Sequence, residues 1–282
     1  MTNEMLINNK YKIIDKIGSG SFGSIYKAEN IRTNENVAIK VEDIKNDTKL
    51  LKNESIIYQY LKNCDGIPNI KWFGKDETNN YMVINLLGDS LQNIKNKKFV
   101  FSLKQTLQIG IQLVKLLKTI HNQGLVHRDI KPDNFLLGAN NDTRQLYLID
   151  FGFCKSYMNG NSHIELKNTS SLIGSQTYAS INAHEFKELS RRDDMESLGY
   201  LLLYFYLGTL KWQDISNLGS SYSDLNDTIK QMKIMVLEDR TIPVVLLNYL
   251  KYVRTLHFKD KPFYDDIIED FKSEIENIIK NN

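Results

Sequence analysis

The chain has 282 residues, 41% of them hydrophobic and 25% charged, a composition typical of a globular protein that can bury one large core or two lobes. Its 36 basic and 34 acidic side chains nearly cancel to a formal net charge of +2, so the overall charge does not point to a nucleic acid or a membrane as a partner. Two cysteines, Cys64 and Cys154, and the lack of an apolar signal segment after Met1 argue against a disulfide framework. We therefore expect an intracellular protein, cytoplasmic, nuclear or both.

Short strand-like runs dominate the chain from Tyr11 to Tyr81. They alternate polar and apolar residues or carry β-branched and aromatic side chains, with Gly, Asn and Asp between them, and they read YKIIDKI, SIYKAEN, NVAIKVE, NIKWFGK and NYMVINLL. This pattern predicts a small antiparallel sheet. One helix is expected to interrupt it, from about Asp47 to Leu61, because Leu51, Ile57 and Leu61 form an apolar stripe.

Helical patterns follow after Gly88. Ser102 and Gln105 fit a capping box, and the apolar residues from Leu103 to Ile120 keep helical spacing up to Gly124, a residue suited to end a helix. Beyond this helix, the run QLYLIDFGF alternates like a strand and is followed by a long loop.

The most apolar segment of the chain is LGYLLLYFYLG, Leu198 to Gly208. It is too short to span a bilayer, which takes about 20 apolar residues, so it predicts a buried core helix. A helix around Ile242 to Leu256 and an amphipathic one carrying Ile267 and Phe271, with Ile275 and Ile278, complete the chain. The whole predicts an α+β protein with a β-rich lobe at about residues 1–87 and a helical lobe at about 88–282.

The stretch GSGSFGSIY contains Gly18, Gly20 and Gly23 in a G-x-G-x-x-G spacing, which lets a backbone approach phosphate oxygens. The strand-like alternation from Ser24 to Ala28 favours a hairpin over phosphates rather than the start of a helix. By itself the motif leaves open a plain glycine- and serine-rich turn. The residues expected to contact the nucleotide here are Ile17, Gly18, Ser19, Gly20, Ser21, Phe22, Gly23, Ser24 and Ile25.

Lys40 ends the run VAIK on the next predicted strand, two residues after Ala38. Strand alternation can direct its ammonium group into the cleft beneath the glycines. Glu54, on the predicted helix, is the expected partner that holds Lys40 against the α and β phosphates. A single lysine or glutamate is more often a solvated surface residue, but the shared spacing favours a site.

The stretch HRDIKPDNF, His127 to Phe135, crowds ionisable side chains into one loop. Asp129 is the candidate base that accepts the proton of an attacking hydroxyl, and Lys131 can neutralise charge on the transferred phosphoryl group. Asn134 and Asp150, the latter in DFG, offer the hard oxygen ligands that magnesium prefers. The sequence thus predicts phosphoryl transfer, in which charge neutralisation and positioning do most of the work.

Two neighbours of Asp129 have other expected roles. His127 is expected to pack within the loop rather than act as a base. Arg128 is expected to face the loop after Gly152, where it either binds an anion or stabilises the turn.

Together, GSGSFGSIY, VAIK, Glu54, HRDIKPDN and DFG resemble the protein kinase family in order and spacing. The resemblance implies a bilobal fold with ATP and Mg²⁺ in a cleft between the lobes, protein substrates, and a monomer. It also implies that Ile84 lines the adenine pocket and that Leu86 and Leu87 supply hinge backbone groups. Lys131 in this setting favours serine or threonine over tyrosine as the phosphate acceptor.

A narrower resemblance, to casein kinase 1, rests on LLGDSL, YASIN and SRRDDMESLGY, and extends through GTLKWQ and HFKDKPFYDDI. It implies that Asp194 is buried and ties the helix near residue 200 to the loop containing Asp129. Casein kinase 1 proteins usually have GTARYASIN, whereas this chain has GSQTYASIN, with Thr177 at the arginine position and Ser170 replacing a common lysine. Because a hydroxyl cannot replace a guanidinium group for phosphate, we expect a weakened preference for phosphate-primed substrates.

Two alternatives stay open at this stage. A nucleotide-binding pseudokinase that acts as a scaffold would usually lack Lys40, Asp129 or Asp150, and none is missing here. A kinase for small metabolites would keep the aspartates but generally lack Lys131 in this setting and the SIN segment.

Overall fold

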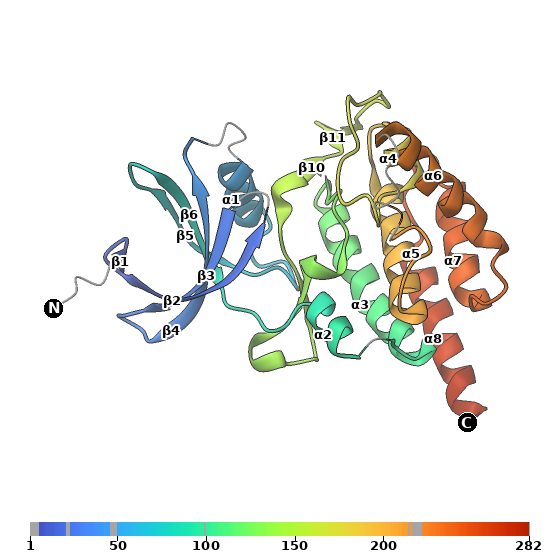
Figure 1. The fold of residues 1–282 in the computed structure, drawn as a ribbon, viewed down its shortest axis with the longest axis horizontal. Helices are drawn as coiled ribbons and strands as arrows, with labels where there is room; N and C mark the ends of the chain where they lie inside the picture. The colour runs from blue at the N-terminus through green and yellow to red at the C-terminus, as the bar shows by residue number, and fades with distance from the viewer. Residues whose placement is uncertain are drawn as a thin grey trace. The chain divides into compact units, whose positions relative to one another are not determined.

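The computed structural model describes residues 6–20, 23–45, 50–98, 100–213, 215 and 222–281 (Figure 1). The chain forms two compact units. The N-terminal unit comprises Met1–Asp89 with Leu136–Gly152, and the C-terminal unit comprises Ser90–Phe135 with Phe153–Asn282. The segment that contains Asp150 therefore packs with the N-terminal sheet, although it follows the first helices of the C-terminal unit in sequence.

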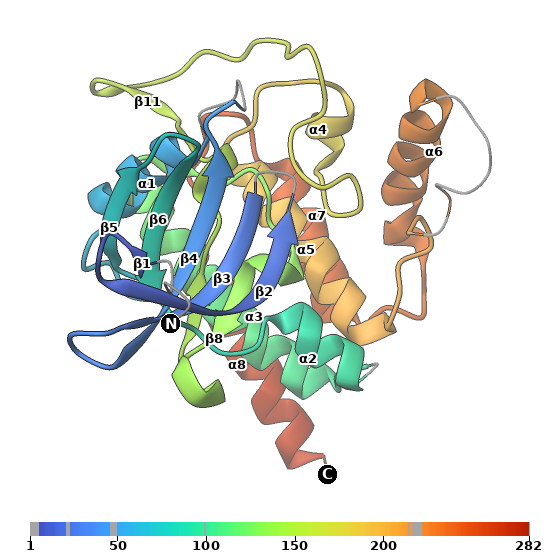
Figure 2. The same ribbon diagram turned by 60° about the vertical axis from the view of Figure 1, so that its left-hand side comes forward.

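The N-terminal unit is built on a six-stranded sheet in the order β1-β2-β3-β4-β6-β5, in which every neighbouring pair is antiparallel (Figure 2). The five strands expected from the sequence are all present, and β1 is an addition. The strand bounds are β1 Leu6–Ile7, β2 Tyr11–Gly20, β3 Gly23–Asn30, β4 Glu35–Asp43, β5 Ile70–Lys75 and β6 Asn79–Asn85. The short strands β8 Phe135–Leu137 and β9 Leu146–Leu148 pair with each other.

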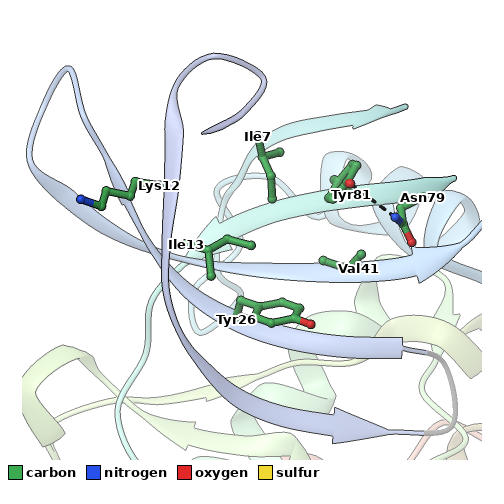
Figure 3. Close-up of a pocket in the computed structure, with 7 residues that line it drawn as sticks. All are labelled: Ile7, Lys12, Ile13, Tyr26, Val41, Asn79 and Tyr81. Carbon is green, nitrogen blue, oxygen red and sulfur yellow. Dashed lines mark hydrogen bonds between the residues drawn. The ribbon is translucent and has the colours of Figure 1, made fainter. Parts of the chain in front are cut away.

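The two faces of this sheet differ in chemistry because side chains alternate along each strand. Val37, Ile39 and Val41 of β4 belong to an apolar cluster on one face. Figure 3 shows the Val41 side chain beside Ile7, Ile13, Tyr26 and Tyr81 around a pocket of about 390 Å³ on that face. Alternation places the side chain of Lys40 on the opposite face, away from this apolar cluster.

The helix α1, Leu50–Tyr60, packs against β5 and β6. Leu51 and Leu61 are buried as the sequence predicts, but Ile57 is only half-buried and Tyr58 is 1% exposed. The buried side of the helix thus includes Tyr58 and the carboxylate of Glu54. The expected start of this helix at Asp47 lies outside the described residues.

The C-terminal unit is mostly helical, with α3 in contact with α5 and α8, and α5 in contact with α7. The helix α5 is buried along almost its whole length, which confirms the core helix predicted there. Within the described part of the chain, we find no helix with the length and apolarity that a membrane span requires. The helix bounds are α2 Leu91–Lys98, α3 Leu103–Asn122, α4 Ile181–His184, α5 Arg191–Leu207, α6 Tyr222–Met235, α7 Val244–Thr255 and α8 Tyr264–Lys280. Short strands in this unit are β7 Leu125–Val126, which pairs with β10 Lys155–Ser156, and β11 Met158–Asn159, which pairs with β12 Ser162–His163.

The helix α3 begins and ends as its sequence predicts. The Ser102 side chain accepts a hydrogen bond from the Gln105 backbone N–H, and the Gln105 side chain completes the capping box. Gly124 follows the helix with a φ of +76°, a left-handed conformation that glycine adopts without steric cost. This cap turns the chain into β7 and then into the loop that contains Asp129.

Three helices were not expected from the sequence: the four-residue α4 and the longer α2 and α6. The helix α2 buries only Leu91 and Lys95, so it has no extended apolar stripe. The helix α6 lies in a segment for which the sequence pattern predicts no element. Both depend on packing against the rest of the unit, with α2 against the loop at Pro132–Asn134 and α6 against α4. The predicted combination of a small antiparallel sheet with one helix and a larger helical part is confirmed.

Candidate active site

The glycine-rich stretch forms the predicted hairpin between β2 and β3. Gly18 pairs with Ile25, Ser19 with Ser24, and Gly20 with Gly23. Ser21 and Phe22, at its tip, lie outside the described residues. A β-bulge interrupts the pairing between Lys16 and Gly18, and it leaves the Ile17 side chain 51% exposed.

Gly23 is required by the local backbone and not only by a ligand. Its φ is +135°, and a Cβ added there would lie 1.9 Å from the backbone oxygen of Val41. Any side chain at this position would therefore separate the hairpin from β4. At Gly18, in contrast, a Cβ would make ordinary contacts with Ile25.

Lys40 is held between two carboxylates of the N-terminal unit. Its Nζ lies 2.7 Å from Glu54 Oε2, which confirms the predicted pair, and 2.9 Å from Asp150 Oδ1, which the sequence did not predict. Burial lowers the pKa of Lys40, but the attraction of Glu54 and Asp150 outweighs it and raises that pKa above its ordinary value. Burial also raises the pKa of Glu54 to about 7, against the lowering effect of Lys40. Lys40 is thus a fixed cation.

Asp150 is positioned by a residue that the sequence reasoning missed. Its φ is +64°, and its backbone N–H donates to the Tyr58 hydroxyl at 3.3 Å. Tyr58 also packs edge-on against Phe151, with ring centroids 5.0 Å apart. Because Tyr58 lies one helical turn after Glu54, α1 positions both the carboxylate beside Lys40 and the backbone of Asp150. The spacing of four residues between Glu54 and Tyr58 could have indicated from the sequence that both side chains lie on the same face of the helix.

Other predicted nucleotide-binding residues share the sheet face of Lys40. Directly paired residues of antiparallel strands project to the same face, and Ile25 pairs with Lys40, whereas Ala38 pairs with Ile84. Leu86 and Leu87 follow β6 and are half-buried. The roles of all these residues in binding a nucleotide stay predictions. The common sheet face of Ile25, Ala38 and Ile84 agrees with the predicted roles of these three.

In the C-terminal unit, Asp129 is the centre of a network of short hydrogen bonds. Lys131 Nζ lies 2.6 Å from Asp129 Oδ2, while the backbone N–H and the hydroxyl of Ser175 both donate to Oδ1 at 2.8 Å. Asn134 Nδ2 donates to the Asp129 backbone oxygen at 2.8 Å. The structure thus places the predicted Asp129, Lys131 and Asn134 together and adds Ser175, which sequence reasoning did not single out.

The backbone of this loop is held by Asp194, as the casein kinase 1 resemblance implies. Its two carboxylate oxygens accept from the backbone N–H groups of His127 and Arg128 at 2.7 and 2.8 Å, and the His121 ring lies 3.0 Å away. These bonds offset the strained φ of +69° at Arg128. Burial raises the pKa of Asp194, but these partners outweigh burial and lower that pKa below its ordinary value. His127 is fully buried in the loop, as predicted.

The Arg128 side chain faces the segment after Gly152, as predicted. Its Nε donates to the backbone oxygen of Phe153 at 2.6 Å, and Nη1 lies 3.7 Å from Glu188 Oε1. Lys155 contacts the other oxygen of Glu188 at 2.8 Å. The buried Glu188, which the sequence analysis missed, thus supplies an internal anion to this basic cluster.

Each unit contains one predicted oxygen donor of the kind that magnesium prefers. Asp150 offers a carboxylate that is 23% exposed, and Asn134, because its Nδ2 donates to Asp129, presents its amide oxygen as the remaining acceptor. Within the described ranges, no three histidine, cysteine, aspartate or glutamate residues gather into a metal site made by protein alone.

A comparison with protein-family models gives an independent result. The model described as protein kinase domain matches residues 11–280, nearly the whole chain. The matched range contains the glycine hairpin, Lys40, Asp129 and Asp150.

Proposed function

The chain belongs to the protein kinase family, and we propose that it is a serine/threonine kinase of casein kinase 1 type. It would transfer the γ-phosphoryl group of ATP to serine and threonine hydroxyls of protein substrates. The family membership supports a phosphotransferase that uses ATP and a divalent metal ion. The serine or threonine acceptor, the casein kinase 1 subgroup and the weak preference for primed substrates are what we propose beyond the family membership.

The observation that carries the proposal is the network around Asp129. An acceptor hydroxyl attacks the γ-phosphorus, its proton passes to the Asp129 carboxylate, and the bond between the γ-phosphorus and the oxygen of ADP breaks. Lys131, 2.6 Å from that carboxylate, orients it and stabilises negative charge on the transferred group. Lys40, fixed by Glu54 and Asp150, would bind the α and β phosphates. Magnesium, when bound, neutralises further charge on the phosphates.

The casein kinase 1 subgroup is supported by the way the SIN segment is anchored. Ser180 Oγ donates to Asp193 Oδ1 at 2.7 Å, and Asn182 Nδ2 donates to the same oxygen at 3.0 Å. Trp212, from the GTLKWQ stretch, donates its Nε1–H to the backbone oxygen of Thr177 at 2.8 Å. Residues from the stretches that resemble casein kinase 1 thus hold Thr177 itself and the segment that follows Tyr178.

Weak recognition of primed substrates is supported by the charges of the same region. Thr177 brings no positive charge to the position where casein kinase 1 proteins usually have arginine. The nearby Arg128 and Lys155 already contact the buried Glu188. A substrate phosphate would therefore have to compete with an internal carboxylate for these cations.

Both cysteines of the chain, Cys64 and Cys154, are free thiols. Thiols stay reduced inside cells, which supports an intracellular location. Fluorescence microscopy of the tagged protein tests this part of the proposal, and a signal confined to secretory compartments would contradict it.

Labelling with radioactive ATP and magnesium on a degenerate peptide array tests the activity and the acceptor. We expect incorporation into serine and threonine peptides that falls by about 1,000-fold in Asp129→Asn. Asp227→Asn, which changes an exposed carboxylate on α6, is the matched control and should keep wild-type rates. Equal labelling by wild type and Asp129→Asn would indicate a contaminating kinase and favour the pseudokinase scaffold instead.

Kinetics on matched primed and unprimed peptides test the substrate preference. For the wild type we expect a primed-to-unprimed ratio of kcat/KM below about 10, and in Thr177→Arg an increase of that ratio by about tenfold, because one charge-assisted contact contributes that much. Thr255→Arg adds the same charge at an exposed site of α7 and controls for general attraction. A strong primed preference in the wild type would refute the proposal.

A further inference from the structure

The helices α7 and α8 pack against each other (Figure 1). Residues of both helices line a surface groove of about 570 Å³. Tyr249, Ile267 and Phe271 lie at the base of this α7–α8 groove and are buried. Its edges are apolar but open to solvent, with Val244 70% exposed and Phe263 64% exposed. Large apolar side chains that line a groove and remain exposed are typical of an interaction surface.

Phe263 is held in place although it is exposed. Its backbone N–H donates to the Tyr252 hydroxyl at 2.8 Å, and the two rings stack with centroids 6.3 Å apart. An aromatic ring fixed in this way loses little conformational freedom when a partner covers it, which is a property of residues that dominate binding energy.

Three carboxylates on α8, Asp266, Asp270 and Glu274, border the groove at intervals of four residues. Within residues 222–281 and the other described ranges, no basic side chain pairs with any of them. Among the other acids of α8, Asp265 contacts Lys118 and Glu269 contacts Lys272, whereas Glu276 forms no ion pair within the described residues. Three of the four carboxylates of α8 that lack an ion pair among the described residues therefore border the groove.

We propose that the α7–α8 groove binds a basic amphipathic helix of a partner protein. Apolar residues of that helix would cover Phe263, Val244 and the groove base, and lysines or arginines would face Asp266, Asp270 and Glu274. Carboxylates four residues apart on one helix are about 6 Å apart along its axis, which matches basic residues four apart on a helix packed alongside.

A helix fits this groove better than an extended peptide does. An extended segment binds mainly by adding backbone hydrogen bonds to a sheet edge, whereas α7 and α8 use their backbone groups internally. A second copy of this chain placed symmetrically on the groove would bring the same carboxylates towards one another, and an anionic membrane would be repelled. The groove lies outside the proposed catalytic network, so binding there can be tested separately from phosphoryl transfer.

Fluorescence anisotropy with a designed peptide tests this inference. The probe is a fluorescein-labelled helix of about 20 residues with leucines along one face and lysines beside them. Its controls are a scrambled peptide of the same composition and a version with glutamate in place of lysine. Each is titrated with the full chain at low and at physiological ionic strength.

We expect the probe to bind the wild-type chain, with affinity that falls as salt rises, and neither control peptide to bind comparably. The triple variant Asp266→Asn, Asp270→Asn, Glu274→Gln should weaken binding about tenfold. Phe263→Ala should weaken it about fivefold or more without changing the salt dependence. The matched control, Glu269→Gln with Glu276→Gln, changes acids of α8 that do not line the groove and should bind as the wild type does.

Equal binding of the probe by the triple variant and the control variant overturns the proposal, as does equal binding of the scrambled peptide. Sedimentation of the wild type and of Phe263→Ala provides a second test. A wild-type dimer that becomes monomeric in Phe263→Ala would show that a second copy occupies the groove, and the proposal would then be wrong. Circular dichroism spectra and melting curves, recorded for each variant, establish that it is folded before its binding is interpreted.

Discussion

At the scale of single residues, Tyr58 shows how one side chain can support a site that it does not belong to. Its hydroxyl accepts the Asp150 backbone N–H at 3.3 Å, and its ring packs against Phe151. The tyrosine is 1% exposed, so water cannot replace the hydroxyl as an acceptor. The orientation of Asp150, and with it the second contact to Lys40, thus depends on α1.

Tyr58→Phe removes the hydroxyl that accepts from the Asp150 N–H while preserving the packing of the ring. We expect a loss of about 1 kcal/mol in the free energy of unfolding and a several-fold rise in KM for ATP, because an unmade hydrogen bond costs about that much. Urea unfolding and steady-state kinetics measure both quantities. Tyr60→Phe, at a site that is 58% exposed on the same helix, should change neither. A Tyr58→Phe enzyme with wild-type KM would show that Asp150 is positioned by its other contacts.

At the scale of elements, α6 is connected to the segment after Ser175 by one buried lysine. Lys233 is fully buried, and its Nζ donates to the backbone oxygens of Gln176 and Ala179 at 2.9 and 2.6 Å. It also lies 3.0 Å from His184 Nε2 and over the ring of Tyr200 at 4.8 Å. Burial lowers the pKa of Lys233 well below its ordinary value, while its three hydrogen-bond acceptors suit the three protons of an ammonium group.

Lys233→Met should leave the two backbone oxygens without a donor in a buried site. We expect the free energy of unfolding to fall by about 2–4 kcal/mol and KM for peptide substrates to rise more than KM for ATP, because the loosened loop carries Ser175. Denaturant unfolding and two-substrate kinetics give these values. Lys230→Met removes a lysine from the same helix that pairs with Asp227, and it should cost less than about 1 kcal/mol. Equal losses in the two variants would contradict the role given to Lys233.

At the scale of the whole molecule, the stability of the chain should depend on pH through a buried histidine. His184 Nδ1 lies 2.7 Å from Asn226 Oδ1, an acceptor, so Nδ1 carries the proton and Nε2 accepts from Lys233. Burial and the charge of Lys233 lower the pKa of His184 from 6.5 to about 4. The unfolded chain therefore binds a proton at a higher pH than the folded chain does.

It follows that the free energy of unfolding should fall as the pH drops from about 6.5 to about 4, with His184 contributing up to about 3 kcal/mol of that loss. Burial raises the pKa of Asp193 to about 6, so protonation of Asp193 increases the free energy of unfolding over part of the same pH range. The contribution of His184 is therefore read from the difference between the wild type and a His184 variant. His184→Gln keeps a donor and an acceptor and should show a shallower loss than the wild type. The free energy of unfolding is measured across this pH range for the wild type, for His184→Gln and for the control His257→Gln, which changes an exposed histidine. Parallel curves for the wild type and His184→Gln would show that His184 does not cause the loss of stability.

Features that depend on neighbours along the chain can be predicted from the sequence. The alternation of YKIIDKI and NVAIKVE specifies strands, Ser102 and Gln105 specify the start of α3, and the spacing of the motifs around Lys40, Asp129 and Asp150 specifies a kinase. These patterns need no tertiary information, because a strand or a helix places residues two, three or four apart at known relative positions.

The contacts between groups that are distant in the sequence become visible in the folded chain. Asp150 reaches Lys40 across 110 positions of sequence, and Ser175 reaches Asp129 across 46. Glu188 and Lys233 took roles that nothing in their surrounding sequence indicates, since a glutamate or a lysine by itself reads as solvated surface. The physical reason is that burial makes an unpaired charge costly, so the fold supplies each buried ion with partners from whichever segments pack around it.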